Sequence, residues 1–186
     1  MKHSNDLFYI QRVKAGDIRA FSSIVSNYQK MVFAIVLKIV PNREDAEDIM
    51  QEIFVKVFKS LNQYREESEF STWLYRIAYN TTISELRKRK ISYVPINENL
   101  YSDNEPLVEE EELDLANIQL QYLDEALKKL PPDEIFLVTL YYFKEQSIDA
   151  ISKISHLSVA NVKVKLYRIR KKLAIEINQL LENEYK

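Results

Sequence analysis

Apolar residues recur at every third or fourth position along most of the chain, which is the spacing of one face of an α-helix. The pattern is clearest in residues 158–173, SVANVKVKLYRIRKKL, where six basic residues fill the gaps between the apolar ones. The apolar positions are Val159, Val162, Leu166, Ile169 and Leu173. This stretch predicts a helix with one buried stripe and a strongly positive remainder.

Helical spacing also predicts how the first half of the chain is organised. The expected helices cover residues 6–15, 17–41, 42–60 and 72–90, and residues 62–70, NQYREESEF, are expected to form a loop. Gly16, the only glycine, suits a left-handed turn between the first two helices. The expected N-caps of the three later helices are Asp17, Asn42 and Ser71.

The second half ends in a helix-turn-helix pattern. Helical spacing resumes within residues 109–130, and Pro131 and Pro132 separate that helix from the apolar segment 133–143. Ser147 is the expected N-cap of a short helix and Ser158 that of the basic helix, with His156 in the turn between them. A short helix, a tight turn and a longer basic helix are typical of DNA-binding domains.

The composition favours helices throughout. Only one Gly and five Pro occur among 186 residues, too little turn chemistry for a many-stranded sheet. Residues 97–115 carry eight acidic side chains and neither Lys nor Arg, so the rest of the chain is net positive. We therefore predict an all-α protein with two small helical domains, at residues 1–94 and 113–186, joined by an acidic linker at residues 95–112.

The residue content also limits the range of possible functions. The chain has no Cys and only two isolated His residues, so we expect no metal and no cofactor. No Gly-rich phosphate loop and no nucleophile beside a base is evident, which argues against an enzyme. The most apolar run, residues 31–40, is about half as long as a membrane span and contains Lys38. Because the N-terminus does not resemble a secretory signal, we expect a cytoplasmic protein without membrane insertion.

The basic helix could bind duplex DNA, an anionic membrane or an acidic protein. Its stripe of Val, Ile and Leu suits a compact core, to which the preceding short helix would add Ile148, Ile151 and Ile154. One exposed face is then expected to hold Asn161, Lys165, Arg168 and Lys172, with Lys163, Val164 and Tyr167 beside it. Such side chains can reach base edges and phosphates in a major groove. A solvated basic surface on a structural helix is the alternative.

Three features of the first domain also invite a functional interpretation. Asp45, Asp48 and Glu52 form an acidic stripe on the third helix, although a solvated surface would look the same. Aromatic residues of the loop region stand beside arginines, as in proteins that hold unstacked bases; these are Tyr64, Phe70 and Trp73 with Arg65 and Arg76. Core packing is the alternative, and we expect it for Trp73. Asn80, about one turn after Arg76, carries an amide that can read a base edge.

Taken in order, these segments resemble the extracytoplasmic-function (ECF) class of bacterial sigma factors. The similar segments are AGDIRAFSSIVSNYQ at residues 15–29, EDAEDIMQEIFVKVF at 44–58 and FSTWLYRIAYNTTISELRK at 70–88, followed by residues 126–173, which end in the helix-turn-helix. Nearly the whole chain is covered apart from the connector and the C-terminal tail. Several motifs occur in the right order at the right separations, which makes the resemblance specific.

The resemblance implies a factor that binds core RNA polymerase, recognises promoter DNA at a minus-35 and a minus-10 type element, and helps to open the duplex. The face made by Asp45, Asp48, Gln51 and Glu52 resembles the surface that docks on the polymerase. The residues expected at the melted element are Tyr64, Arg65, Arg76 and Asn80, and those expected at the distal element are Lys163, Val164, Lys165, Tyr167 and Arg168. Many members of the class are held inactive by an anti-sigma protein, and the sequence leaves open whether this chain has one.

The chain departs from the usual pattern of the class at several positions, among them 156 and 164. His156 stands in the turn where Gly is usual, so a left-handed conformation with some strain is expected there. Val164 stands where a small polar residue is common, which could favour contact with a thymine methyl. Two other functions stay open at this point: a stand-alone helix-turn-helix regulator that never binds polymerase, and a helical protein whose basic helix docks on an acidic partner.

Overall fold

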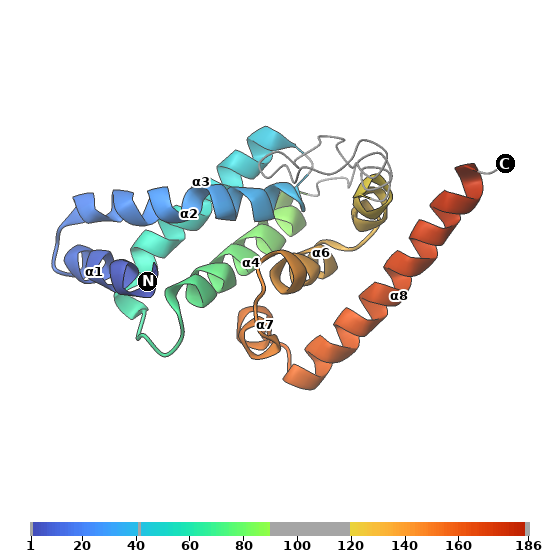
Figure 1. Cartoon of the computed structure of the whole chain (residues 1–186). Coiled ribbons are helices and arrows are strands. Elements are labelled where there is room, and N and C mark those ends of the chain that lie inside the picture. Colours follow the sequence, from blue (N-terminus) through green and yellow to red (C-terminus); the bar gives the residue numbers. More distant parts are fainter. Residues whose placement is uncertain (1, 41, 90–119, 185–186) are drawn as a thin grey trace, which may run out of the picture.

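The computed structural model describes residues 2–40, 42–89 and 120–184, and every secondary-structure element in these ranges is helical (Figure 1). The predicted all-α class is therefore confirmed. The predicted acidic linker at residues 95–112, with both of its boundaries, lies outside the described residues.

The first part of the fold consists of four α-helices with two short 3-10 turns. They are α1 (Lys2–Lys14), η1 (Ile18–Ala20), α2 (Phe21–Leu37), α3 (Arg43–Ser60), η2 (Leu61–Gln63) and α4 (Phe70–Arg89). Helix α3 packs against both α2 and α4. The stretch Ile18–Leu37 is long and apolar enough to cross a membrane by length and composition alone. One face of it, with Ile24, Val32 and Ile35, is fully buried in the helical core.

The observed ends of these helices agree only in part with the caps and turns predicted from the sequence. Gly16 has φ +98°, the left-handed turn expected of it, and the Asn42 side chain accepts a hydrogen bond from the Asp45 amide at 3.0 Å. Asp17 stands at the expected N-cap position, before η1, but its carboxylate pairs with Arg12 and makes no cap hydrogen bond. The expectation for Ser71 is wrong: α4 already begins at Phe70, so Ser71 lies within the helix.

The second part of the fold contains the predicted helix-turn-helix. A helix over residues 120–128 precedes α6 (Pro132–Val138), which continues into a π-helical turn, η3 (Thr139–Phe143). Helices α7 (Ile148–Ser155) and α8 (Val159–Glu184) follow. Pro132 occupies the start of α6, where its missing amide proton costs no helical hydrogen bond.

Both predicted caps of the helix-turn-helix are present. The Ser147 hydroxyl accepts a hydrogen bond from the Ala150 amide at 3.1 Å, and the Ser158 hydroxyl accepts one from the Asn161 amide at 3.2 Å. His156 has φ 58° and ψ 24°, so it adopts the expected left-handed conformation. Ile151 of α7 is fully buried, as is Val162 of α8, and the two helices pack against each other.

Helix α4 belongs to the packing of both parts of the chain (Figure 1). It packs against α7 and α6, and the rings of Tyr79 and Phe136 meet edge to face with centroids 5.1 Å apart. Nearby, Lys38 Nζ lies 4.4 Å from the ring centroid of Phe143. Burial lowers the pKa of Lys38. In this arrangement the two halves share one continuous set of packed helices.

His156→Gly is expected to raise the free energy of unfolding by about 0.5 to 1 kcal/mol. A left-handed conformation costs a non-Gly residue roughly 1–2 kcal/mol, while Gly loses roughly 0.5–1 kcal/mol more chain entropy on folding. Urea unfolding followed by circular dichroism measures the difference. Lys153→Gly, at an exposed helical position of α7, is the control and should lower stability by about 1 kcal/mol. A loss of stability in His156→Gly would show that contacts of the imidazole stabilise the fold by more than the left-handed conformation destabilises it.

Candidate polymerase-binding and DNA-binding surfaces

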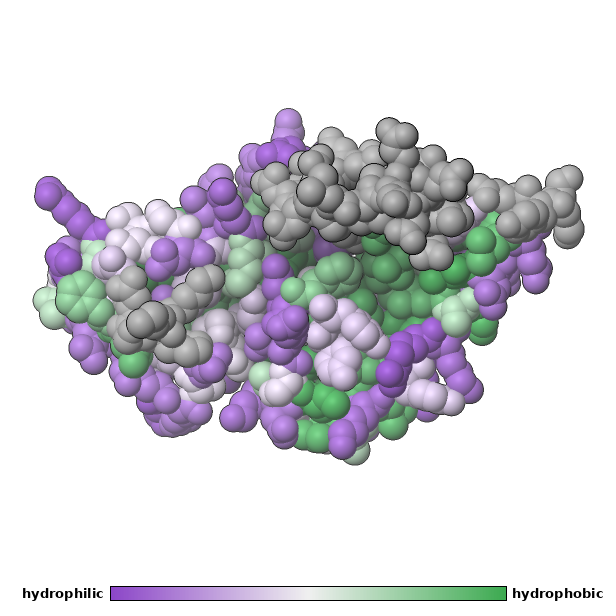
Figure 2. Space-filling model, in the orientation of Figure 1, coloured by the Kyte–Doolittle hydropathy of each residue, from purple (hydrophilic) through white to green (hydrophobic). Residues whose placement is uncertain are grey.

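The apolar stripe of α8 is buried, which fixes the side of the helix that faces outward. Val162, Leu166 and Ile169 are at most 3% exposed. Val164 and Tyr167 lie on the opposite side and are 45% and 52% exposed. Figure 2 shows hydrophobic side chains on the side of α8 that faces α6 and hydrophilic ones along its outer edge. The outer face of α8 thus combines an aliphatic and an aromatic side chain with cations.

The cations of α8 fall into two groups. Lys165 Nζ is 2.5 Å from the Asp133 carboxylate, and Lys172 Nζ is 2.8 Å from the Glu134 carboxylate, both on α6. Asn161, Arg168 and Lys172 are exposed as expected, whereas Lys165 is only partly exposed. Positions 165 and 172 flank the buried stripe closely enough to reach the neighbouring helix.

The second group of cations points away from the core. Lys163, Arg168 and Arg170 are exposed and form no ion pair with any described residue. Lys171 Nζ lies 4.9 Å from the ring centroid of Tyr167, one helical turn earlier. Lys171 was not among the predicted site residues, although its position four residues after Tyr167 could have suggested it.

The loop before α4 is built around a cluster of aromatic rings. The ring centroid of Tyr64 lies 5.5 Å from that of Phe70 and 5.3 Å from that of Trp73. Tyr64 is only 4% exposed, its hydroxyl donates to the Ser68 carbonyl at 2.7 Å, and burial raises its pKa. Trp73 is buried as expected. The Tyr64 ring therefore supports the loop from beneath and is not exposed as a stacking platform.

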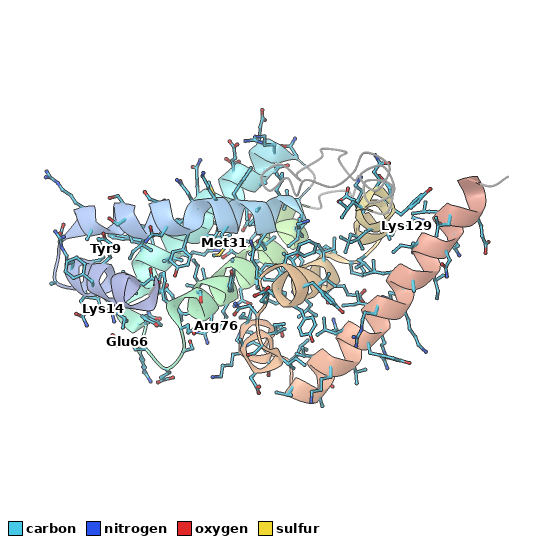
Figure 3. All side chains as sticks on the ribbon, in the orientation of Figure 1. Tyr9, Lys14, Met31, Glu66, Arg76 and Lys129 are labelled. Carbon is cyan, nitrogen blue, oxygen red and sulfur yellow. The ribbon has the colours of Figure 1, made fainter. Side chains whose placement is uncertain are left out.

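The polar residues predicted for the melted element are exposed. Arg65 is 82% exposed at the loop tip, 4.0 Å from Glu67, and the adjacent Glu66 has φ 61°. Arg76 and Asn80 are exposed one turn apart on α4, and Figure 3 shows Arg76 on the side of α4 where α7 lies. A cavity of about 370 Å³ lies between the start of α4 and the beginning of α7. Ser68, Glu69 and Thr72 line one side of it, and residues between Glu145 and Lys153 line the other.

The predicted polymerase-binding residues share one side of α3. Asp48 and Gln51 are exposed, Asp45 is partly exposed, and Glu52 pairs with Lys56 at 2.7 Å. Two apolar side chains, missed by the sequence reasoning, continue this helix surface: Val55 is 50% exposed and Phe58 is 39% exposed. The Phe58 ring packs edge to face on Phe21. Helical spacing places Val57 on the buried face and leaves Val55 and Phe58 off it, but it gave no reason to assign them to a binding surface.

Two family models match the chain, one on each side of the undescribed segment. The model of sigma-70 region 2 matches residues 24–91, and the model of sigma-70 region 4 matches residues 120–173. The first range contains α3, α4 and the loop between them, and the second contains α6, α7 and most of the basic part of α8.

Relatives match almost the whole chain. The ECF RNA polymerase sigma factor SigW of Bacillus subtilis is 31% identical, over 92% of this chain and 96% of its own length. The ECF RNA polymerase sigma-E factor of Escherichia coli K12 is 30% identical, over 95% of this chain and 96% of its own length. The chain therefore belongs to the ECF class of RNA polymerase sigma factors.

Two solved structures have the same fold. CnrH, in its complex with the cytosolic domain of CnrY, has a TM-score of 0.67 at 20% identity and covers 94% of this chain and 98% of its own. RpoE of Bartonella quintana, in its complex with the anti-sigma factor NepR, has a TM-score of 0.67 at 19% identity and covers 87% of this chain and 98% of its own.

Tyr64→Ala is expected to lower the free energy of unfolding by about 3 to 5 kcal/mol, the usual loss for a large buried aromatic side chain. Arg65→Ala, at the neighbouring exposed position, should stay within about 0.5 kcal/mol of wild type. Chemical unfolding of both variants measures the contrast. Equal stabilities would mean that Tyr64 does not hold the loop in place.

Proposed function

We propose that the two parts of this sigma factor divide the work of promoter recognition, with α3 docking on core RNA polymerase, α4 and its preceding loop engaging the melted element, and α8 reading the distal element. The observation that carries the proposal is the match to ECF sigma factors over more than nine-tenths of the chain. A regulator that acts without the polymerase is not favoured by these full-length relatives.

The proposed polymerase-binding surface consists of the acidic residues of α3 and the apolar residues next to them. Asp48, Gln51 and Glu52 supply charge and hydrogen-bond acceptors, while Val55 and Phe58 offer exposed apolar area. Interfaces commonly combine an apolar centre with a polar rim, so the two sets of side chains suit a single docking surface. Asp45 is the fourth polar member at the N-terminal end of α3.

At the melted element, the proposed contacts are Arg65, Arg76 and Asn80. Two cations can neutralise backbone phosphates, and the Asn80 amide can hydrogen-bond to the edge of an unpaired base. Capturing an extruded base offsets the few kcal/mol that unstacking costs, so binding itself could favour an open duplex. Tyr64 would act here through the shape of the loop, because its ring is buried.

At the distal element, the proposed reading residues are Lys163, Val164, Tyr167 and Arg168 of α8. Val164 and Tyr167 can contact thymine methyl groups, and the two cations can reach base acceptors or phosphates. Lys165 belongs to the same stretch of sequence, but its ion pair with Asp133 gives it a different environment.

The proposed partners are core RNA polymerase and promoter DNA. The two solved relatives with the same fold are complexes, with CnrY in one case and with the anti-sigma factor NepR in the other. We propose that this chain also binds an inhibitory protein partner. We further propose that the factor acts in the cytoplasm, needs no cofactor, and has no enzymatic activity of its own.

Asp48→Arg is expected to weaken binding to core RNA polymerase by at least about thirtyfold, because reversing a charge inside an interface typically costs 2 kcal/mol or more. Co-elution with purified core enzyme and a fluorescence binding titration measure the loss. Glu182→Arg is the control: it makes the same charge change at an exposed position near the end of α8. Equal affinities of the two variants would rule out α3 as the docking surface.

A further inference from the structure

Two ion pairs join the DNA-reading helix to the first turn of α6. Lys165 pairs with Asp133, and Lys172 pairs with Glu134. The two lysines are seven residues, or two helical turns, apart on α8, while the two acids are adjacent on α6. Glu134 is only 14% exposed, and Lys165 and Asp133 are each about one-third exposed. These contacts lie beside the buried stripe of α8 rather than on its outer face.

A third ion pair continues the same edge of α8. Lys129, which follows the helix over residues 120–128, reaches Glu176 at 2.5 Å, and Figure 3 shows its side chain directed toward α8. Positions 165, 172 and 176 all flank the apolar stripe on the same side. Three charged contacts therefore lie along one edge of α8, beside its buried stripe.

We propose that Asp133 withholds Lys165 from DNA, and that Lys171, held over Tyr167, contacts a backbone phosphate of the distal element. A lysine that already neutralises a carboxylate adds no net positive charge at the DNA surface. Lys171 has no ion pair with any described residue and therefore keeps its full charge for a phosphate.

The stacking of Lys171 on Tyr167 supports this assignment. A cation over an aromatic ring is attracted to the ring face, which limits the positions that a flexible lysine samples. Tyr167 and Val164 lie on the outer face, so Lys171 extends that face by one turn toward the C-terminus. Phosphate contacts on the flank of the reading residues set the register of a helix on the duplex.

The inference rests on the proposed role of α8 in DNA binding. The salt dependence of binding distinguishes a failure of that role from a failure of the assignment of Lys171. The experiment uses the full chain and a fluorescently labelled duplex of random sequence, with binding constants measured by anisotropy at a series of KCl concentrations. Each phosphate neutralised by the protein contributes about 0.9 to the slope of log K against log salt.

Lys171→Gln should reduce the magnitude of the slope by about 0.9, the contribution of one phosphate contact. Asp133→Asn should increase it by about 0.9, because Lys165 is then free to neutralise a phosphate. The double variant Asp133→Asn/Lys165→Gln removes the ion pair as a unit and should have the wild-type slope. Lys165→Arg keeps the pair and should behave as wild type.

Three results would overturn the inference. A slope reduced as much in the double variant as in Lys171→Gln would mean that Lys165 itself contacts DNA. An unchanged slope in Asp133→Asn would mean that the acid does not withhold Lys165 from a phosphate. An unchanged slope in Lys171→Gln, with a reduced slope in Arg168→Gln, would mean that Lys171 contacts no phosphate although α8 still binds DNA. If Arg168→Gln and Lys171→Gln both bind as wild type, the proposed role of α8 in DNA binding fails as well.

Discussion

Burial of one apolar stripe on α8 is the constraint from which the DNA-binding surface follows. Val162, Leu166 and Ile169 must face the core, because exposing any of them would lose roughly 1.5 to 3 kcal/mol of hydrophobic stabilisation. Once they are buried, helical geometry leaves Val164 and Tyr167 on the outside and brings Lys165 and Lys172 within reach of α6. The same constraint thus separates the cations that face outward from those that pair with carboxylates of α6.

Helix α4 has a comparable role between the two parts of the chain. One side completes the core formed with α2 and α3, and another packs on α6 and α7 through contacts such as that of Tyr79 with Phe136. Arg76 and Asn80 lie on a further part of its surface and stay exposed. A single helix carries these packing surfaces and the proposed base reader. A change in the contacts of α4 with α6 and α7 would therefore alter the surroundings of Arg76 and Asn80.

Much of the fold could be predicted from local sequence signals, because caps and helical spacing act over a few residues. Asn42, Ser147 and Ser158 cap the helices they were expected to cap, and the third helix ends at Ser60 as predicted. Features that depend on distant residues could not be predicted. The ion pair of Lys165 with Asp133 spans 32 positions of sequence, and the burial of Tyr64 depends on how the loop folds over Phe70 and Trp73. The π-helical turn at Thr139–Phe143 has no distinct hydrophobic period from which it could be predicted.

Run-off transcription from genomic DNA of the source organism tests the central claim most directly. Core RNA polymerase would be reconstituted with and without the purified chain, and the 5′ ends of the transcripts would be sequenced. The account predicts start sites that require the chain and share a two-part upstream motif, one part for α4 with its loop and one for α8. Start sites that are the same with core enzyme alone, or that share no upstream motif, would contradict it.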